Sequence, residues 1–249
     1  FITNMKTIKT TFFMALLLSF TFNFSQAQQR YQIHVDNVKP SMVGEYEKTA
    51  KAFVDACNKY NPEGPWITAS TNDMKYMYIS PMENFAELDK NVFADMSKAM
   101  GDEYGKMFQD FDKCYDSHSD FVITLAEGLT YMPEGISQTQ EGLNYRNWYY
   151  LYYTPENSRN VWEAMKGVKQ LFESKGSKNS YRVYRSGFGC PENFYLVAVS
   201  AKDELDSAMR GKANEELLGE ERGPVFGNLM KYVSRFEEVT GYMRPDLSY

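Results

Sequence analysis

The sequence lacks the short motifs that hold metals and nucleotides in many enzymes. It contains no CxxC, no HExxH and no GxxxxGK[ST]. Its one GxG fragment, Gly187-Phe188-Gly189, lies in a predicted loop between strands and is followed closely by Pro191. A phosphate-cradling loop needs a helix N-terminus behind it, which is absent from this prediction. The classes of enzyme that these motifs define are therefore excluded.

Histidine and cysteine are also scarce. The chain has two His, His34 and His118, so a site of several His is excluded. A mixed His/carboxylate site stays open, without a motif that supports it. We predict no metal and no cofactor. Of the three Cys, at least one stays unpaired. Cys57 and Cys114 lie on apolar faces of predicted helices, which favours buried thiols over a disulfide between them.

Basic residues are fewer than acidic residues. The chain has 27 Lys and Arg against 33 Asp and Glu, and its formal net charge is −6. Such a chain repels nucleic acids and anionic membrane surfaces, so we expect neither as a partner. A small-molecule ligand remains as the expected partner, and the chain is expected to be a monomer or a homodimer.

The N-terminal residues have the order of regions found in a signal peptide. After Met5 come two Lys, an apolar run over Phe12–Phe22, and small residues in Ser25-Gln26-Ala27. The apolar run is short for a bilayer span. We predict a signal peptide over residues 1–27, with residues 1–4 as upstream extras, and a soluble mature protein in the periplasm or outside the cell.

Two stretches of the chain repeat one plan. Lys75–Leu88 and Asn193–Leu205 each read as an apolar strand, a polar break and a helix start. Aligned on Ser80 and Ser200, their apolar positions coincide. This echo predicts one structural unit written twice, over residues 28–133 and 145–249, with the Gly-containing polar stretch 134–144 as linker.

Each unit reads β-α-β-β-α-β. Strands come from period-two alternation, as in Tyr31–Val38, and helices from apolar residues at helical spacing. The fold class is therefore α+β, with two tandem ferredoxin-like units packed sheet to sheet. In the first unit we predict a helix over Glu83–Met100, and we place His118 in a polar, solvated helix–strand junction before a strand over Phe121–Leu125.

This order resembles the dimeric α/β-barrel superfamily, which includes antibiotic-biosynthesis-monooxygenase-like and NIPSNAP-like proteins. The resemblance rests on element order, the duplication and the junctions at Ser80 and Ser200. It implies an intrachain α/β-barrel pseudo-dimer. No family signature matches residue by residue, so the resemblance assigns no catalytic residue.

His34 and Asp36 are the best candidates for catalysis. They lie on the polar face of the first strand, where alternate residues are roughly 6.5–7 Å apart. Asp36 could tune His34 as a general base, directly or through water. The alternative is a wet or structurally hydrogen-bonded strand face.

Aromatic residues provide the candidate ligand-binding surface. Several share strand faces with one another and with an arginine, and we expect these faces to meet between the two sheets. That space would suit a planar, weakly acidic molecule, although the same residues could simply fill a core. The candidates are Tyr76, Tyr78, Trp148, Tyr150, Tyr152, Arg182 and Tyr184.

Three functions follow as hypotheses. The first is an exported protein that binds a small molecule between its sheets. The second, implied by the resemblance, is a cofactor-independent monooxygenase or isomerase in which His34 and Asp36 act as base and Tyr or Arg182 steadies an oxyanion. A haem-dependent variant would have His34 as its main axial candidate. The third is a structural or interaction protein with a filled core.

Overall fold

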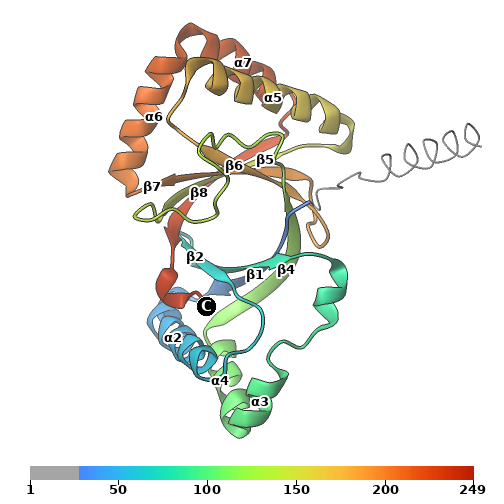
Figure 1. Cartoon of the computed structure of the whole chain (residues 1–249), viewed down its shortest axis with the longest axis vertical. Helices are drawn as coiled ribbons and strands as arrows, with labels where there is room; N and C mark the ends of the chain where they lie inside the picture. Colours follow the sequence, from blue (N-terminus) through green and yellow to red (C-terminus); the bar gives the residue numbers. More distant parts are fainter. Residues whose placement is uncertain (1–27) are drawn as a thin grey trace, which may run out of the picture.

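The computed structural model describes residues 28–249, and the predicted signal peptide lies outside them. Along the described residues, eight strands alternate with helices (Figure 1). The first half contains β1 (Arg30–Val38), α2 (Val43–Tyr60), β2 (Ile67–Thr71), β3 (Lys75–Met82), α3 (Ala94–Met100), α4 (Asp102–Asp112) and β4 (Tyr115–Leu125). The second contains β5 (Tyr145–Tyr152), α5 (Ser158–Lys175), β6 (Tyr181–Ser186), β7 (Phe194–Ala201), α6 (Glu204–Leu218), α7 (Arg222–Met230) and β8 (Arg235–Met243).

The strands form one closed barrel. Its order is β1-β3-β2-β8-β5-β7-β6-β4, and every neighbouring pair is antiparallel. Within the first half the order is β4-β1-β3-β2, and within the second it is β8-β5-β7-β6. The α+β barrel prediction is confirmed. The sheets also join edge to edge, at β2–β8 and β4–β6, which face-to-face packing alone does not require.

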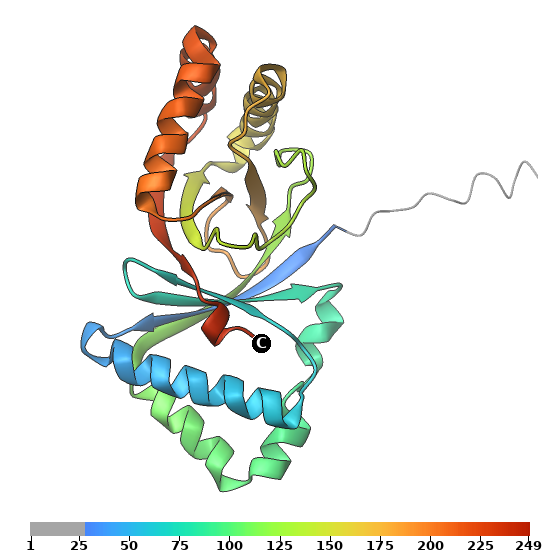
Figure 2. The same ribbon diagram turned by 60° about the vertical axis from the view of Figure 1, so that its left-hand side comes forward.

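The helices cover the barrel from two sides. Helices α2, α3 and α4 lie on the outer side of the first half's sheet, and α5, α6 and α7 lie on the outer side of the second half's sheet (Figures 1 and 2). Helix α3 contacts α2 and α4, and α7 contacts α5. None of the helices in the described region is both long and apolar enough for a bilayer span. The last residues cross back to the first half, where Trp66 Nε1 donates to the carbonyl of Leu247 at 3.0 Å.

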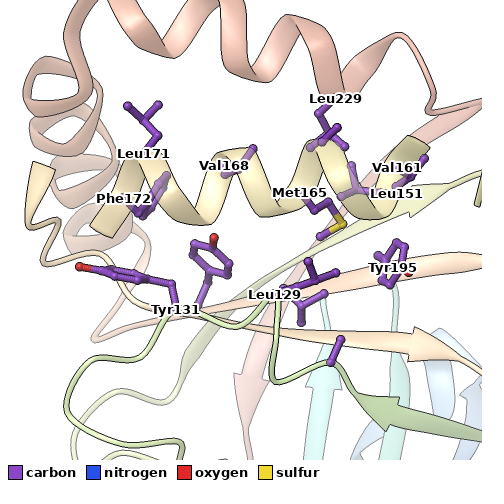
Figure 3. Close-up of a cluster of buried hydrophobic side chains, with 14 of the residues drawn as sticks. Leu129, Tyr131, Leu151, Val161, Met165, Val168, Leu171, Phe172, Tyr195 and Leu229 are labelled. Atoms are coloured by element: carbon purple, nitrogen blue, oxygen red, sulfur yellow. The ribbon is translucent and has the colours of Figure 1, made fainter. Parts of the chain in front are cut away.

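Alternation along each strand separates a core inside the barrel from the cores under the helices. On β1, Tyr31, Ile33 and Val35 are buried inside the barrel, whereas Gln32 and His34 face the helices. A second core lies outside the barrel, between α5 and the second half's sheet (Figure 3). Its labelled members are Leu129, Tyr131, Leu151, Val161, Met165, Val168, Leu171, Phe172, Tyr195 and Leu229.

Two sequence predictions for the first half are wrong. The helix predicted over Glu83–Met100 is a short 3-10 turn at Phe85–Asp89, an irregular stretch and then α3. Asn84 starts that turn with a capping box, and its side chain accepts from Ala86 N at 3.0 Å. Strand β4 begins six residues before the predicted strand. Its first residues are polar and show no apolar alternation, but their backbone pairs with β1.

Candidate functional site

A large cavity lies between the outer face of the first half's sheet and its helices. Its volume is about 650 Å³. The floor is polar and comes from the outward side chains of β1 and β3, including Gln32, His34, Asp36, Tyr78 and Ser80. The walls are largely aromatic and come from α2, α4 and the loops between strands. The aromatic wall residues are Phe53, Trp66, Phe93, Phe108 and Phe111.

His34 is held between two carboxylates. Its Nε2 lies 3.1 Å from Asp36 Oδ1, and its Nδ1 lies 3.0 Å from Asp120 Oδ1. Burial opposes the imidazolium charge, but the hydrogen bonds and charges of Asp36 and Asp120 outweigh it and raise the pKa of His34 to about 9. The sequence left open whether His34 contacts Asp36 directly or through water, and the contact is direct. At neutral pH the free imidazole needed for a general base is a minor form.

Asp36 continues into a buried hydrogen-bonded chain. Its side chain is almost fully buried, and Oδ2 accepts from the hydroxyl of Tyr46 at 2.6 Å. The hydroxyls of Tyr46 and Tyr78 lie 2.8 Å apart. Burial, followed by the negative partners around it, raises the pKa of Tyr46 far above its usual range. Burial also raises the pKa of Tyr78, so both hydroxyls stay protonated. Because Tyr46 gives its one hydroxyl hydrogen to Asp36, Tyr78 is the donor to Tyr46.

His118 joins this group from the neighbouring strand. It lies in β4, not in the predicted solvated junction, and pairs across the ladder with Asp36. The ring centroids of His34 and His118 are 5.5 Å apart. One ligand atom each from His34, Asp36 and His118 lie within 4.8 Å of one another. Among the described residues, these are the side chains that could together hold a metal.

The predicted aromatic surface is divided between two places. Tyr76 and Tyr78 do not face the space between the sheets; they pack toward α2, since the inward positions of β3 belong to Met77 and Ile79. The prediction that all the aromatic candidates share one space is therefore wrong. Tyr46, which is fully buried on α2, was not among the candidate site residues from the sequence.

The remaining candidates lie inside the barrel. Trp148, Tyr150, Tyr152 and Tyr184 belong to the barrel core, and Arg182 is buried at one end. The cavity left there is about 50 Å³, which is far below the usual 300–1,000 Å³ of a ligand pocket. Of the two interpretations that the sequence left open, the filled core is the one that the structure supports for these residues.

A second cavity of about 490 Å³ lies in the second half, between its sheet and α5, α6 and α7. Its walls include Val168, Phe172, Val197 and Phe226. No His or Cys is among its lining residues in the described structure. Its lining includes one carboxylate, Glu215, whereas the first cavity combines histidines with a carboxylate.

The architecture matches solved structures. An anthrone oxidase-like protein aligns with a TM-score of 0.59 at 13% identity, covering 88% of this chain and 92% of that one. A protein designated a monooxygenase from Lactobacillus acidophilus NCFM gives 0.53 at 9%, covering 87% and 94%. A mutant chlorite dismutase from Candidatus Nitrospira defluvii gives 0.50 at 8%, covering 87% and 92%.

These neighbours are members of the dimeric α/β-barrel superfamily, and the chain has their fold. At such identities the similarity shows the fold alone. No protein-family model matches the sequence, and no curated protein matches it.

Proposed function

We propose that this protein binds a small, mainly apolar molecule in the cavity of its first half. The observation that supports this is the 650 Å³ space with aromatic walls and a polar floor. Its volume lies within the range of ligand pockets, and few polar groups in an apolar cavity are what such pockets use to orient a ligand. The earlier hypothesis of a ligand between the sheets is thus moved to the outer side of β1 and β3.

The charged side chains of the cavity floor indicate which kind of ligand fits the cavity. Two carboxylates, Asp36 and Asp120, flank one imidazole, so the floor carries no net positive charge to attract an anion. A planar neutral molecule with a hydroxyl or carbonyl at one edge fits better. Its rings would lie among Phe53, Trp66 and Phe93, and its polar edge would meet the floor.

Calorimetry with 1-naphthol, a neutral two-ring phenol, tests this proposal. Val54 lines the cavity from α2, and Val168 lines the second cavity from α5. We expect Val54→Phe to weaken binding at least tenfold and Val168→Phe to leave it unchanged, with both variants folded by circular dichroism. Loss in Val168→Phe alone would place the site in the second half, and no binding by the wild-type protein would refute the proposal.

A second candidate function is an oxygenase or isomerase acting in the same cavity. It is supported by the fold shared with an anthrone oxidase-like protein and a protein designated a monooxygenase, and by His34 and Asp36 on the floor. Incubation with anthrone in air tests it. Faster anthrone loss with wild-type protein than with folded His34→Ala would support an enzyme, and equal rates would reject it.

We infer further that an ancestral unit was copied and that the barrel is an internal pseudo-dimer. The shared strand order of the two halves supports this. Export also stays a proposal, supported by the order of regions in residues 1–27. N-terminal sequencing of the protein from its native cells tests export, with Gln28 as the expected first residue.

A further inference from the structure

Both histidines of the chain meet at one point on the barrel. The chain has only two, and they come from strands far apart in the sequence. Their ring centroids are nevertheless 5.5 Å apart, with the buried carboxylate of Asp36 beside them. If the two histidines were only solvated surface residues, nothing would favour their lying together beside a buried carboxylate.

The β1–β4 register produces this meeting. In the antiparallel ladder, His34 is opposite Asp120 and Asp36 is opposite His118. Alternate residues of a strand share a face, so all four side chains project from the same side of the sheet. The result is a crossed pattern of two imidazoles and two carboxylates at the cavity floor.

His34, Asp36 and His118 each contact a further side chain that orients it. His34 Nδ1 faces Asp120 at 3.0 Å, and Asp36 Oδ2 accepts from Tyr46 at 2.6 Å. The His118 ring stacks on Tyr115, with centroids 5.7 Å apart and planes at 27°. Metal-binding histidines and carboxylates are usually oriented by such partners on their far side. His34 Nε2 and Asp36 Oδ1 remain directed toward each other.

The spacing of these atoms suits a transition metal. Two ligands at about 2.0–2.2 Å from a tetrahedral zinc ion are roughly 3.3 Å apart. His34 Nε2 and Asp36 Oδ1 are 3.1 Å apart, and a ligand atom of His118 completes a set within 4.8 Å. A bound ion would replace the direct contact of His34 with Asp36, and a small rotation of the exposed His118 would bring in its nitrogen.

We propose that His34, Asp36 and His118 form a binding site for a divalent transition-metal ion of the zinc type. Imidazole nitrogens with one carboxylate oxygen favour such ions over calcium and magnesium, which prefer oxygen ligands alone. Three protein ligands leave a fourth position open, as in catalytic zinc sites. Because all three residues line the cavity, that position faces its interior. This site does not rest on the cavity binding an organic molecule.

Metal titration of the whole protein tests the site. The protein is treated with a chelator, dialysed and titrated with Zn²⁺ by calorimetry, and with Co²⁺ by visible absorption. We expect one ion per chain, and a Co²⁺ spectrum of low coordination number. We expect His118→Ala and Asp36→Asn each to weaken Zn²⁺ binding at least tenfold. His118 is exposed, so its variant should fold even if Asp36→Asn does not.

Asp116→Asn is the matched control. Asp116 is an exposed carboxylate two residues before His118 that lies 3.6 Å from Lys39 Nζ, outside the proposed ligand set. It should leave Zn²⁺ affinity unchanged, whereas Tyr46→Phe, which removes the support of Asp36, should lower it by about tenfold. Equal affinity in wild type and His118→Ala, or equal losses in His118→Ala and Asp116→Asn, would overturn the proposal.

Discussion

The buried guanidinium groups of Arg146 and Arg182 donate to the same backbone oxygen, the carbonyl of Gln138. The N···O distances are 3.3 Å and 2.9 Å. Arg182 also donates to the carbonyl of Ser137 at 2.7 Å. No ion pair forms on either group among the described residues. Backbone carbonyls, and for Arg182 also the hydroxyl of Ser200, solvate these charges. The stretch 134–144, predicted as a linker, therefore has a structural role at the barrel end.

Arg182→Met should destabilise the protein by about 2 kcal/mol. The substitution removes donors from two part-buried carbonyls and from the buried Ser200 Oγ, and a buried acceptor left without a donor costs about 1–3 kcal/mol. Urea unfolding at neutral pH measures the change. Arg159→Met, at an exposed position of α5, is the control and should leave the midpoint unchanged. Equal midpoints for wild type and Arg182→Met would contradict the prediction.

Two tyrosine-to-phenylalanine changes should have opposite outcomes. Tyr46 donates to Asp36 at 2.6 Å, so Tyr46→Phe should cost about 1–3 kcal/mol of unfolding free energy. Tyr31 is also buried, but within residues 28–249 its hydroxyl has no hydrogen-bond partner. Removing an unpaired buried hydroxyl relieves a desolvation cost, so Tyr31→Phe should be neutral or slightly stabilising. Thermal unfolding of both variants distinguishes them, and equal losses would show that Tyr31 has a bound partner.

The sequence predicted where strands lie better than it predicted which side of the sheet each strand residue faces. Alternation placed β1 over Tyr31–Val38, one residue from its observed start, because a half-buried strand leaves a period of two. The same period does not say which face meets helices and which meets the other sheet. Tyr76 and Tyr78 were assigned to the wrong side for this reason. Their burial against α2 depends on which sheet faces which helices, and local patterns do not contain that information.

The approach of His118 to His34 could not be predicted either. The segment Asp116–Asp120 is polar throughout and has no strand pattern, and its β-structure comes from pairing with β1. Register between strands far apart in the sequence is fixed by the closed barrel. The candidate pair His34 and Asp36 was visible because both lie on one strand. The approach of His118 and Asp120 to this pair depends on how β4 pairs with β1 in the folded protein.

Gly241→Ala should break the β2–β8 seam. A Cβ at Gly241 would lie 2.0 Å from the backbone oxygen of Ser70 and 2.8 Å from Cα of Thr71, and backbone cannot move aside as a side chain can. This seam has only three residue pairs, so we expect a loss of about 3 kcal/mol or more. Urea unfolding measures it. Gly211→Ala, in α6 with open space around it, should instead stabilise by about 0.5–1 kcal/mol. A tolerated Gly241→Ala would mean that the seam is looser than described.

The stability contributed by Arg244 should disappear in acid. Arg244 donates to Glu47 of α2, and its Nε and a terminal nitrogen lie 2.9 Å and 2.8 Å from the two oxygens of Asp246. Hydrogen bonding to Arg244 lowers the pKa of both carboxylates. A carboxylate with a lowered folded-state pKa stabilises the fold above its unfolded pKa, about 3.9–4.3, and this contribution is lost as pH falls through the folded value.

Arg244→Met should therefore cost about 1 kcal/mol at pH 7, since the carboxylates are about one-third exposed and water screens them. The difference from wild type should shrink below about pH 4 and vanish once both carboxylates are protonated in the folded protein. Urea unfolding at pH 7 and at stepwise lower pH follows it. Lys166→Met removes an exposed pair with Glu163 and should change little at any pH. A difference that stays constant with pH would mean that Arg244 acts through packing of its apolar stem and not through its charge.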